Sequence, residues 1–424
     1  MTDRLPARRL PLLYLSTAHA ALLFACLLAA LWPRAVAGFF YHSWMVAIVH
    51  LVTLGWITFS ILGAFYIVGP IALRMEMPVR RGDYVAYGFA LVGLIGMVGH
   101  FLIEEYGGMA WSAATVMCGI VYTTIRFAGA VGRAGVPPAI KLHIVLACFN
   151  IWVAGSMGLL IAIDKVAHFL PGFVLSNVFA HAHLAAIGWA AMMVVGVGYR
   201  LLPMTFPSKM PAGRPIYASA ILLETGVLGL FVTLLLGSAW AVVFGATIAA
   251  GFATFLAQVM WMLRRRVPRP AGAPRLDFGV MHAAAAGLSL AAAIAIGLTL
   301  LVAPASTGTL RAAAAYGVLG LVGFLGQMIV AMETRLLPLN FQIAPPPPHS
   351  MRDRALQAIV FTGWAVGVPA LAAGMFRDSA LLVAIGGWAL FAGVAIATLD
   401  NVCVIGRDVA ASSGLEMAAA GSPR

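Results

Sequence analysis

The sequence contains few charged residues. Only 9% of its 424 residues are Asp, Glu, Lys or Arg, and 62% are hydrophobic. A soluble globular domain carries roughly 25% charged residues. A disordered chain has few apolar residues and a high charge. The composition therefore excludes both a soluble enzyme and a disordered protein.

Cysteine is also scarce. The four cysteines (Cys26, Cys118, Cys148 and Cys403) lie far apart within apolar runs, and no C-x-x-C pair occurs. This spacing excludes a disulfide-stapled secreted scaffold and gives no support to a thiolate metal site. It also excludes covalent haem attachment through a C-x-x-C-H motif. We expect the cysteines to be small core residues.

Long apolar runs are what the sequence has in abundance. A helix that crosses a bilayer needs about 20 mostly apolar residues. The sequence predicts twelve such helices, at 11–31, 43–72, 84–104, 108–131, 139–163, 176–203, 215–237, 239–263, 278–303, 310–339, 355–376 and 379–405. The predicted fold is therefore all-α: a polytopic membrane protein with a single transmembrane bundle over 1–408 and a disordered cytoplasmic tail over 409–424.

The first apolar run permits a second interpretation. Arg8 and Arg9 precede it, and Ala35-Val36-Ala37 follows it, as in a cleaved signal peptide. The run is long for a signal peptide, however, and the internal repeat described below includes it. We therefore predict a helix that is retained.

The basic residues are distributed unevenly between the predicted loops. The net charge is +12 at pH 7. Only four of the 26 Lys and Arg lie on the side opposite the termini, namely Arg34, Lys165, Arg311 and Arg377. The positive-inside rule then predicts that both termini are cytoplasmic, in a bacterial inner membrane. In such a protein the charge indicates contact with membrane lipid, and we expect no nucleic-acid binding.

A repeat recurs every four helices. The helices predicted at 43–72 and 176–203 share a histidine, two glycines, two aromatic residues and a proline at the same offsets. These residues are His50, Gly55, Trp56, Gly63, Tyr66 and Pro70 in the first helix, and His183, Gly188, Trp189, Gly196, Tyr199 and Pro203 in the second. A third, weaker copy has Val318 in place of the histidine, followed by Gly323 and Phe324. The repeat predicts three pseudo-symmetric four-helix arcs, over about 10–135, 136–270 and 271–408.

Several histidines share one predicted depth. His50, His100, His181 and His183 all lie in the outer halves of predicted helices, where ionisable groups are costly and tend to be functional. Imidazole is a common axial ligand of haem iron. His181 and His183 are about 200° apart around a helix, so they cannot bind one iron from the same face.

A structural role remains open for each histidine, because a membrane histidine can simply be a hydrogen-bonded core group. This alternative is strongest for the histidines near the inner side. Each repeat unit has one such histidine in its first helix, namely His19, His143 and His282.

The stretch from His181 and His183 to Gly188 and Trp189 resembles the haem-ligand helix of the catalytic subunit of cbb-type cytochrome oxidases. That subunit belongs to the haem-copper oxidase superfamily. The size and the histidine pattern are also similar to the NnrS haem-copper membrane proteins. The resemblance implies non-covalent haem b, and a function with electrons or with a diatomic gas such as nitric oxide or oxygen. It also implies a cytochrome or another respiratory subunit as partner.

The resemblance further implies residue roles. His181 would bind a high-spin haem, and His183 a low-spin haem whose partner ligand comes from the neighbouring arc, where His50 is available. His100 would lie where the family has a copper-ligand helix, shifted by one arc. Arg377 lies in an outer loop, where the family keeps arginines against haem propionates.

The sequence also departs from the family. It has no adjacent His-His pair for copper and no His-Tyr pattern, and its H-x-H pair lies in the middle arc instead of the last. Copper thus has weaker support than haem, and oxidoreductase activity stays open. The alternatives are a haem-free transporter or channel for protons or metal ions, in which the histidines and Glu224 would serve the transported ion, and an assembly factor for a respiratory complex.

Overall fold

The computed structural model describes residues 8–268, 277–341 and 351–420. These residues form helices, with one isolated β-bridge between Ser208 and Arg266 and no strand. Twelve helices in the described ranges are long and apolar enough to cross a membrane. The predicted all-α class and the twelve spans are therefore confirmed.

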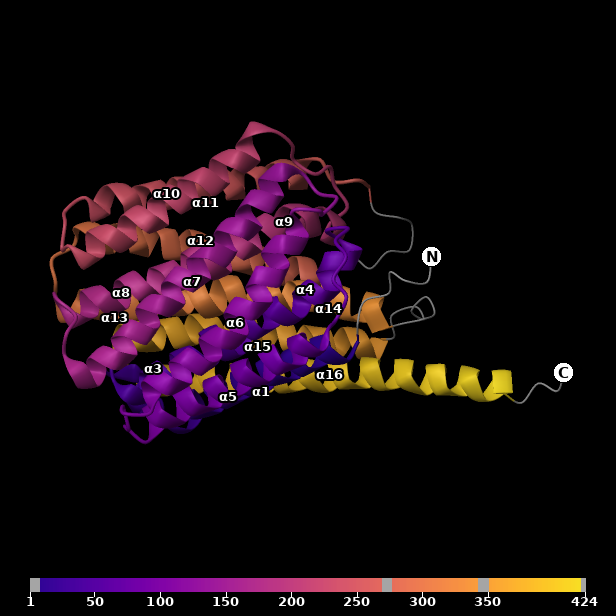
Figure 1. The fold of residues 1–424 in the computed structure, drawn as a ribbon, viewed down its shortest axis with the longest axis horizontal. Coiled ribbons are helices and arrows are strands. Elements are labelled where there is room, and N and C mark those ends of the chain that lie inside the picture. Colours follow the sequence, from indigo (N-terminus) through magenta and orange to yellow (C-terminus); the bar gives the residue numbers. More distant parts are fainter. Residues whose placement is uncertain (1–7, 269–276, 342–350, 421–424) are drawn as a thin grey trace.

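The helices run roughly along the long axis of the molecule and form one bundle (Figure 1). The first repeat unit contains α1 (Arg9–Leu31), the short α2 (Pro33–Ala37), α3 (Ser43–His50), η2 (Leu51–Thr58), α4 (Phe59–Ile71), α5 (Arg81–Leu102) and α6 (Met109–Val131). The second contains α7 (Pro138–Ala167), α8 (Val174–His183), η3 (Leu184–Ala191), α9 (Met192–Thr205), α10 (Arg214–Leu235) and α11 (Ala241–Arg264). The third contains α12 (Phe278–Val302), α13 (Thr307–Val318), η4 (Leu319–Gly326), α14 (Gln327–Phe341), α15 (Met351–Arg377) and α16 (Ala380–Ala420).

The last helix is longer than the sequence led us to expect. It continues to Ala420 and extends beyond the bundle (Figure 1), whereas disorder was predicted from residue 409. The extra segment is rich in alanine. Alanine has the highest helix propensity, which accounts for the helix in a stretch with few other structural signals.

The second helix of each unit changes its winding at the same repeat position. Eight-residue π-helical segments, η2, η3 and η4, begin directly after His50, His183 and Val318. A π-helical turn is wider than an α-helical one, and such turns are often found at functional sites. The three transitions coincide with the register of the sequence repeat.

Glycines explain part of the repeated motif. A Cβ atom on Gly55 would lie 2.5 Å from the Cβ of Ala21 in α1, and one on Gly188 would lie 3.0 Å from the Cβ of Asn150 in α7. A Cβ atom on the aligned Gly323 would likewise lie too close to α12. Only a residue without a side chain lets the first and second helices of a unit approach this closely.

The same contacts correct one feature of the predicted repeat. A Cβ on Gly63 would lie 2.8 Å from the Cβ of Tyr14, and a Cβ on Gly196 would lie 2.4 Å from the Cβ of His143. Tyr14 therefore takes the position in the first unit that His143 takes in the second. His19 lies more than one turn further along α1 and is not the counterpart of His143, although the sequence grouped them.

The contacts between helices also follow the repeat. Within each unit the first helix packs against the second, and the third packs against the fourth. Between units, α6 packs against α7, α11 against α12, and α16 against α1, while η2, η3 and η4 contact one another. These contacts support the predicted threefold arrangement in arcs, which stays a prediction.

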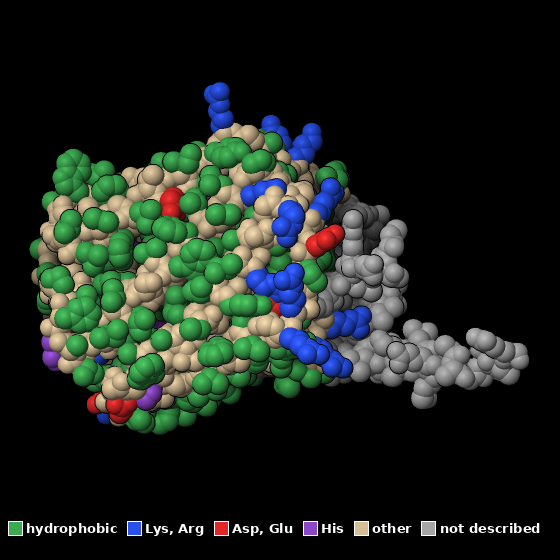
Figure 2. Space-filling view, viewed as in Figure 1, with side chains coloured by type: hydrophobic (Ala, Val, Ile, Leu, Met, Phe, Trp, Pro, Cys, Tyr) green, Lys and Arg blue, Asp and Glu red, His purple; other side chains and the backbone are tan. Residues whose placement is uncertain are grey.

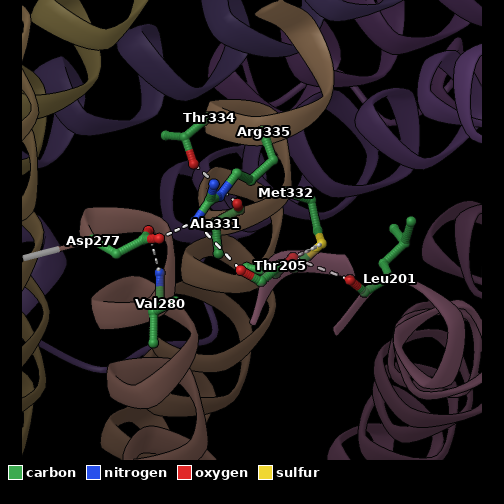
Figure 3. Close-up of polar contacts among 8 residues, drawn as sticks. All are labelled: Leu201, Thr205, Asp277, Val280, Ala331, Met332, Thr334 and Arg335. Atoms are coloured by element: carbon green, nitrogen blue, oxygen red, sulfur yellow. Dashed lines mark hydrogen bonds and ion pairs between the residues drawn. The ribbon is translucent and has the colours of Figure 1, made fainter. Parts of the chain in front are cut away.

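Two arginines join successive units at one end of the bundle. Arg200 Nε donates a hydrogen bond to the carbonyl of Ala72 at 2.9 Å, at the end of α4. At the aligned position, Arg335 donates to the carbonyl of Thr205 at the end of α9 and forms an ion pair with Asp277 (Figure 3). The last carbonyls of a helix have no partner within it, and a cation there also interacts favourably with the helix dipole.

The charged residues are confined to parts of the surface. Figure 2 shows Lys and Arg gathered towards one end of the molecule, with hydrophobic side chains over the face between the two ends. We call this end the basic end. Both termini lie on that side (Figure 1). The asymmetry is that of a membrane protein, and the side that faces the cytoplasm stays a prediction.

The arginine contact predicts a loss of stability. Arg200→Met should lower the free energy of unfolding by about 1–2 kcal/mol, because a part-buried carbonyl loses a charged hydrogen-bond donor. The control is Arg133→Met, because Arg133 is exposed and its replacement should change stability little. Denaturation of both purified variants in detergent measures the difference, and equal stabilities would contradict the proposed contact between units.

Candidate functional site in the large cavity

A large cavity lies inside the bundle. Its volume is about 710 Å³, within the range of roughly 300–1,000 Å³ that is typical of ligand sites. Residues of all three repeat units line it, and most of them are apolar. The polar and ionisable groups of the lining include His50, His181, His183, Lys165, Tyr41, Tyr316, Thr53, Thr58 and Thr309. The structure thus brings together three of the four histidines that the sequence placed at one depth.

The three histidines are held in the same way. Nδ1 of His50 lies 2.8 Å from the carbonyl oxygen of Val46, and Nδ1 of His183 lies 2.8 Å from that of Phe179. Nδ1 of His181 lies 2.9 Å from a carbonyl of α7. Because a carbonyl oxygen can only accept, each Nδ1 carries the proton. Each Nε2 is then an unprotonated nitrogen with a free lone pair. This is the arrangement found in metal-binding histidines, where the second ring nitrogen donates to a carbonyl or carboxylate.

His50 and His181 belong to adjacent units, and both line the large cavity. The ring of His50 also stacks on Phe101 of α5, with centroids 5.3 Å apart. The sequence suggested His183 as the partner of His50, but the ring of His183 faces Tyr316 of the third unit, which leaves His181 as the candidate.

His183 has a different neighbour. Its ring stacks on that of Tyr316 in α13, with centroids 5.8 Å apart and planes inclined by 23°. In the repeat, Tyr316 occupies the position of His181, and Ile48 occupies it in the first unit. The sequence analysis missed Tyr316, although its offset from Val318 is the offset of His181 from His183.

A cationic residue lines the cavity at the end away from the basic end. Lys165 Nζ lies 5.1 Å from the ring centroid of Tyr41 and 4.9 Å from that of Tyr106, within cation–π distance. Burial raises the pKa of Tyr41, and the neighbouring Tyr106 and Asp164 raise it further. Tyr41 therefore stays neutral, and Lys165 is a candidate partner for an anionic group of a ligand.

Two predicted site residues lie elsewhere. Arg377 is exposed at the end of α15, and His100 lies near the end of α5; neither is among the described residues that line the cavity. His100 Nδ1 instead lies 2.8 Å from Glu105 Oε2. The structure thus gives no support to a copper-ligand role for His100, and it places Lys165, not Arg377, at the cavity.

His143 and Glu224 have partners outside the cavity. His143 Nδ1 lies 2.8 Å from the carbonyl of Ala139, and its Nε2 lies 3.1 Å from Ser219 Oγ. Asn150 Nδ2 donates to Glu224 Oε2 at 2.7 Å. These contacts give His143 and Glu224 structural roles.

No protein-family model matches this chain, and no curated protein matches it either. Within the described ranges, no group of three or more His, Cys, Asp or Glu lies together as a metal site would require. A haem needs fewer protein ligands, one or two.

The packing of His181 against α7 gives a prediction. A Cβ on Gly158 would lie 2.8 Å from Cε1 of His181, so Gly158→Ala should displace the ring and lower the free energy of unfolding by about 1–3 kcal/mol. Gly129 is the matched control, because nothing lies within 4 Å of a Cβ there. Gly129→Ala should be neutral or slightly stabilising, since alanine favours helix. Thermal unfolding compares the two, and equal effects would contradict the contact.

The loop after α5 predicts a dependence on pH. Backbone N–H groups of Gly108 and Gly107 donate to Glu105, and with His100 they lower the pKa of its carboxyl group below the ordinary 4.5. A lowered pKa in the folded state contributes stability that is present above 4.5 and is lost as the pH falls through the lower value. Glu105→Gln should reduce this acid dependence in thermal unfolding, and an unchanged dependence would show that other carboxyl groups cause it.

Proposed function

We propose that this chain is an integral membrane protein that binds haem b non-covalently in the large cavity and handles electrons or a diatomic gas, nitric oxide or oxygen. One observation carries the proposal. Three imidazoles, each with Nδ1 committed to a carbonyl, line one apolar cavity of about 710 Å³. An unprotonated Nε2 at a large apolar cavity is what a non-covalent haem requires.

The ligand roles follow from the neighbours of each histidine. His50 and His181 would hold one haem together, because they line the cavity from adjacent units and His183 faces Tyr316 of the third unit instead. The carbonyls of Val46 and Ala154 would hold the two rings in orientation. A haem held by both imidazoles would supply electron transfer more readily than gas binding.

His183 offers a different coordination. It faces Tyr316, so an iron bound there would have a single imidazole ligand and an open position for a gas. His181 and His183 would thus bind ligands on two different sides of one helix, as expected from their angular separation of about 200°.

The remaining residues of the cavity would bind and enclose the group. When bound, haem supplies an iron that takes up one electron or binds a diatomic gas. The apolar lining excludes water, and Lys165 is placed to neutralise a carboxylate at the cavity. Lys165 thereby takes the role first expected of Arg377.

The cellular setting completes the proposal. The basic end would face the cytoplasm, with both termini on that side of a bacterial inner membrane. A cytochrome or another respiratory subunit would supply the electrons.

The absorption spectrum of the purified protein tests this function. Protein produced with adequate haem should show a Soret band that shifts on reduction. His50→Ala and His181→Ala should each remove or displace the band. His143→Ala is the matched control: it also removes a buried histidine, but His143 bonds Ser219 and does not line the cavity.

The outcomes separate the candidate functions. A colourless wild-type protein would overturn the haem proposal and favour a haem-free transporter or an assembly factor. Equal loss of the band in all three variants would show a general effect on folding. Carbon monoxide binding that is abolished by His183→Ala would place the open position at His183.

A further inference from the structure

A second, smaller cavity lies on the bundle axis, further towards the basic end. Its volume is about 100 Å³, and α4, α9 and α14 line it. Ser60 and Met193 line the small cavity, and each lies two residues beyond a residue that lines the large cavity, Thr58 and Ala191 respectively. The two cavities therefore follow one another along the same central helices.

The small cavity contains one carboxyl group. Glu333 of α14 lines it, and its side chain is 12% exposed. Its Oε1 atom is buried and has no hydrogen-bond partner among the described residues, and the same is true of Ser60 Oγ. Polar atoms left unpaired in an apolar interior are costly. A cavity of this size has room for water, which could pair both atoms and carry a proton between them.

The other oxygen of Glu333 faces an imidazole. Glu333 Oε2 lies 3.4 Å from Nε2 of His19. Nδ1 of His19 lies 2.9 Å from the carbonyl oxygen of Leu15, so Nδ1 carries a proton. A neutral His19 and an ionised Glu333 would then place two acceptors against each other. The contact is favourable only when the pair holds a further proton, on His19 Nε2 or on Glu333 itself.

Charged residues of α14 and α16 lie near this site in the sequence. Arg335 follows two residues later on α14, but it is engaged by Asp277. From α16, Asn401 Nδ2 lies 3.5 Å from His19 Nε2, and Asp400 precedes it. The residues of α9 that line the cavity are apolar, and α4 contributes Ser60.

We propose that His19 and Glu333 form a proton-binding site that exchanges protons with the solution at the basic end, and that this site takes up a proton when the large cavity takes up an electron. One electron comes from a reduced respiratory partner, and one proton comes from the solution and binds to the pair. The bundle interior thereby keeps its net charge, which matters because charges interact strongly at low dielectric. The coupling to an electron rests on the proposed haem, whereas the proton site does not.

Infrared spectroscopy of the full-length protein tests the proton site directly. A protonated carboxyl group gives a C=O stretching band that grows on acidification. The wild type should show such a band from Glu333, and Glu333→Gln should lose it. Glu224→Gln is the matched control, since Glu224 is also a carboxyl group in a helix but pairs with Asn150 and does not line the small cavity. An unchanged band in Glu333→Gln would overturn the proposal.

A second variant keeps the test valid if Glu333→Gln does not fold. His19→Gln removes the proton-sharing partner and keeps Glu333. The proton concentration at which the infrared band is half-formed should then change tenfold or more. A titration at the wild-type pH would also overturn the proposed pair.

Proton uptake on reduction tests the coupling. Reduction of the coloured protein in vesicles by an electrochemical mediator should take up about one proton per electron, and this uptake should be lost in Glu333→Gln and kept in Glu224→Gln. Reduction without uptake would overturn the coupling and leave the haem proposal standing. A colourless protein with an intact infrared titration would overturn the haem proposal and leave the proton site standing.

Discussion

The account depends on three hydrogen bonds between histidine Nδ1 atoms and carbonyl oxygens. They fix the tautomer and the orientation of His50, His181 and His183, and they leave each Nε2 with a free lone pair at one apolar cavity. An ionisable side chain inside a bilayer costs free energy, and such residues are typically functional. The combination of anchored rings, free nitrogens and apolar space is what distinguishes these histidines from His143, whose two ring nitrogens both have protein partners.

The rest of the bundle keeps those hydrogen bonds in place. Close approach at Gly55 and Gly188 holds the first helix of a unit against the second. The π-helical segments begin directly after His50 and His183, so the change of winding occurs beside the ligand candidates. The arginine contacts at the basic end join one unit to the next. Packing therefore acts within each unit, the change of winding occurs beside the histidines, and the arginine contacts act between units at the basic end.

The sequence predicted the parts of this architecture that depend on local pattern. Apolar length was enough for the twelve helices, and the spacing of His, Gly and Trp was enough for the repeat register. Contacts between units could not be predicted in the same way. The sequence placed Lys165 among the loop residues, and nothing in the local pattern marked Tyr316 as a residue of the cavity. The residue type alone suggested that His19 and His143 are equivalent. The packing against Gly63 and Gly196 shows instead that Tyr14 is the counterpart of His143 in the first unit.

A cryo-electron microscopy map of the purified full-length protein tests the central claim most directly. The account predicts a planar density in the large cavity, held between the Nε2 atoms of His50 and His181, with Lys165 towards its edge. A map in which these two rings turn towards lipid, or in which side chains fill the space between them, would contradict it.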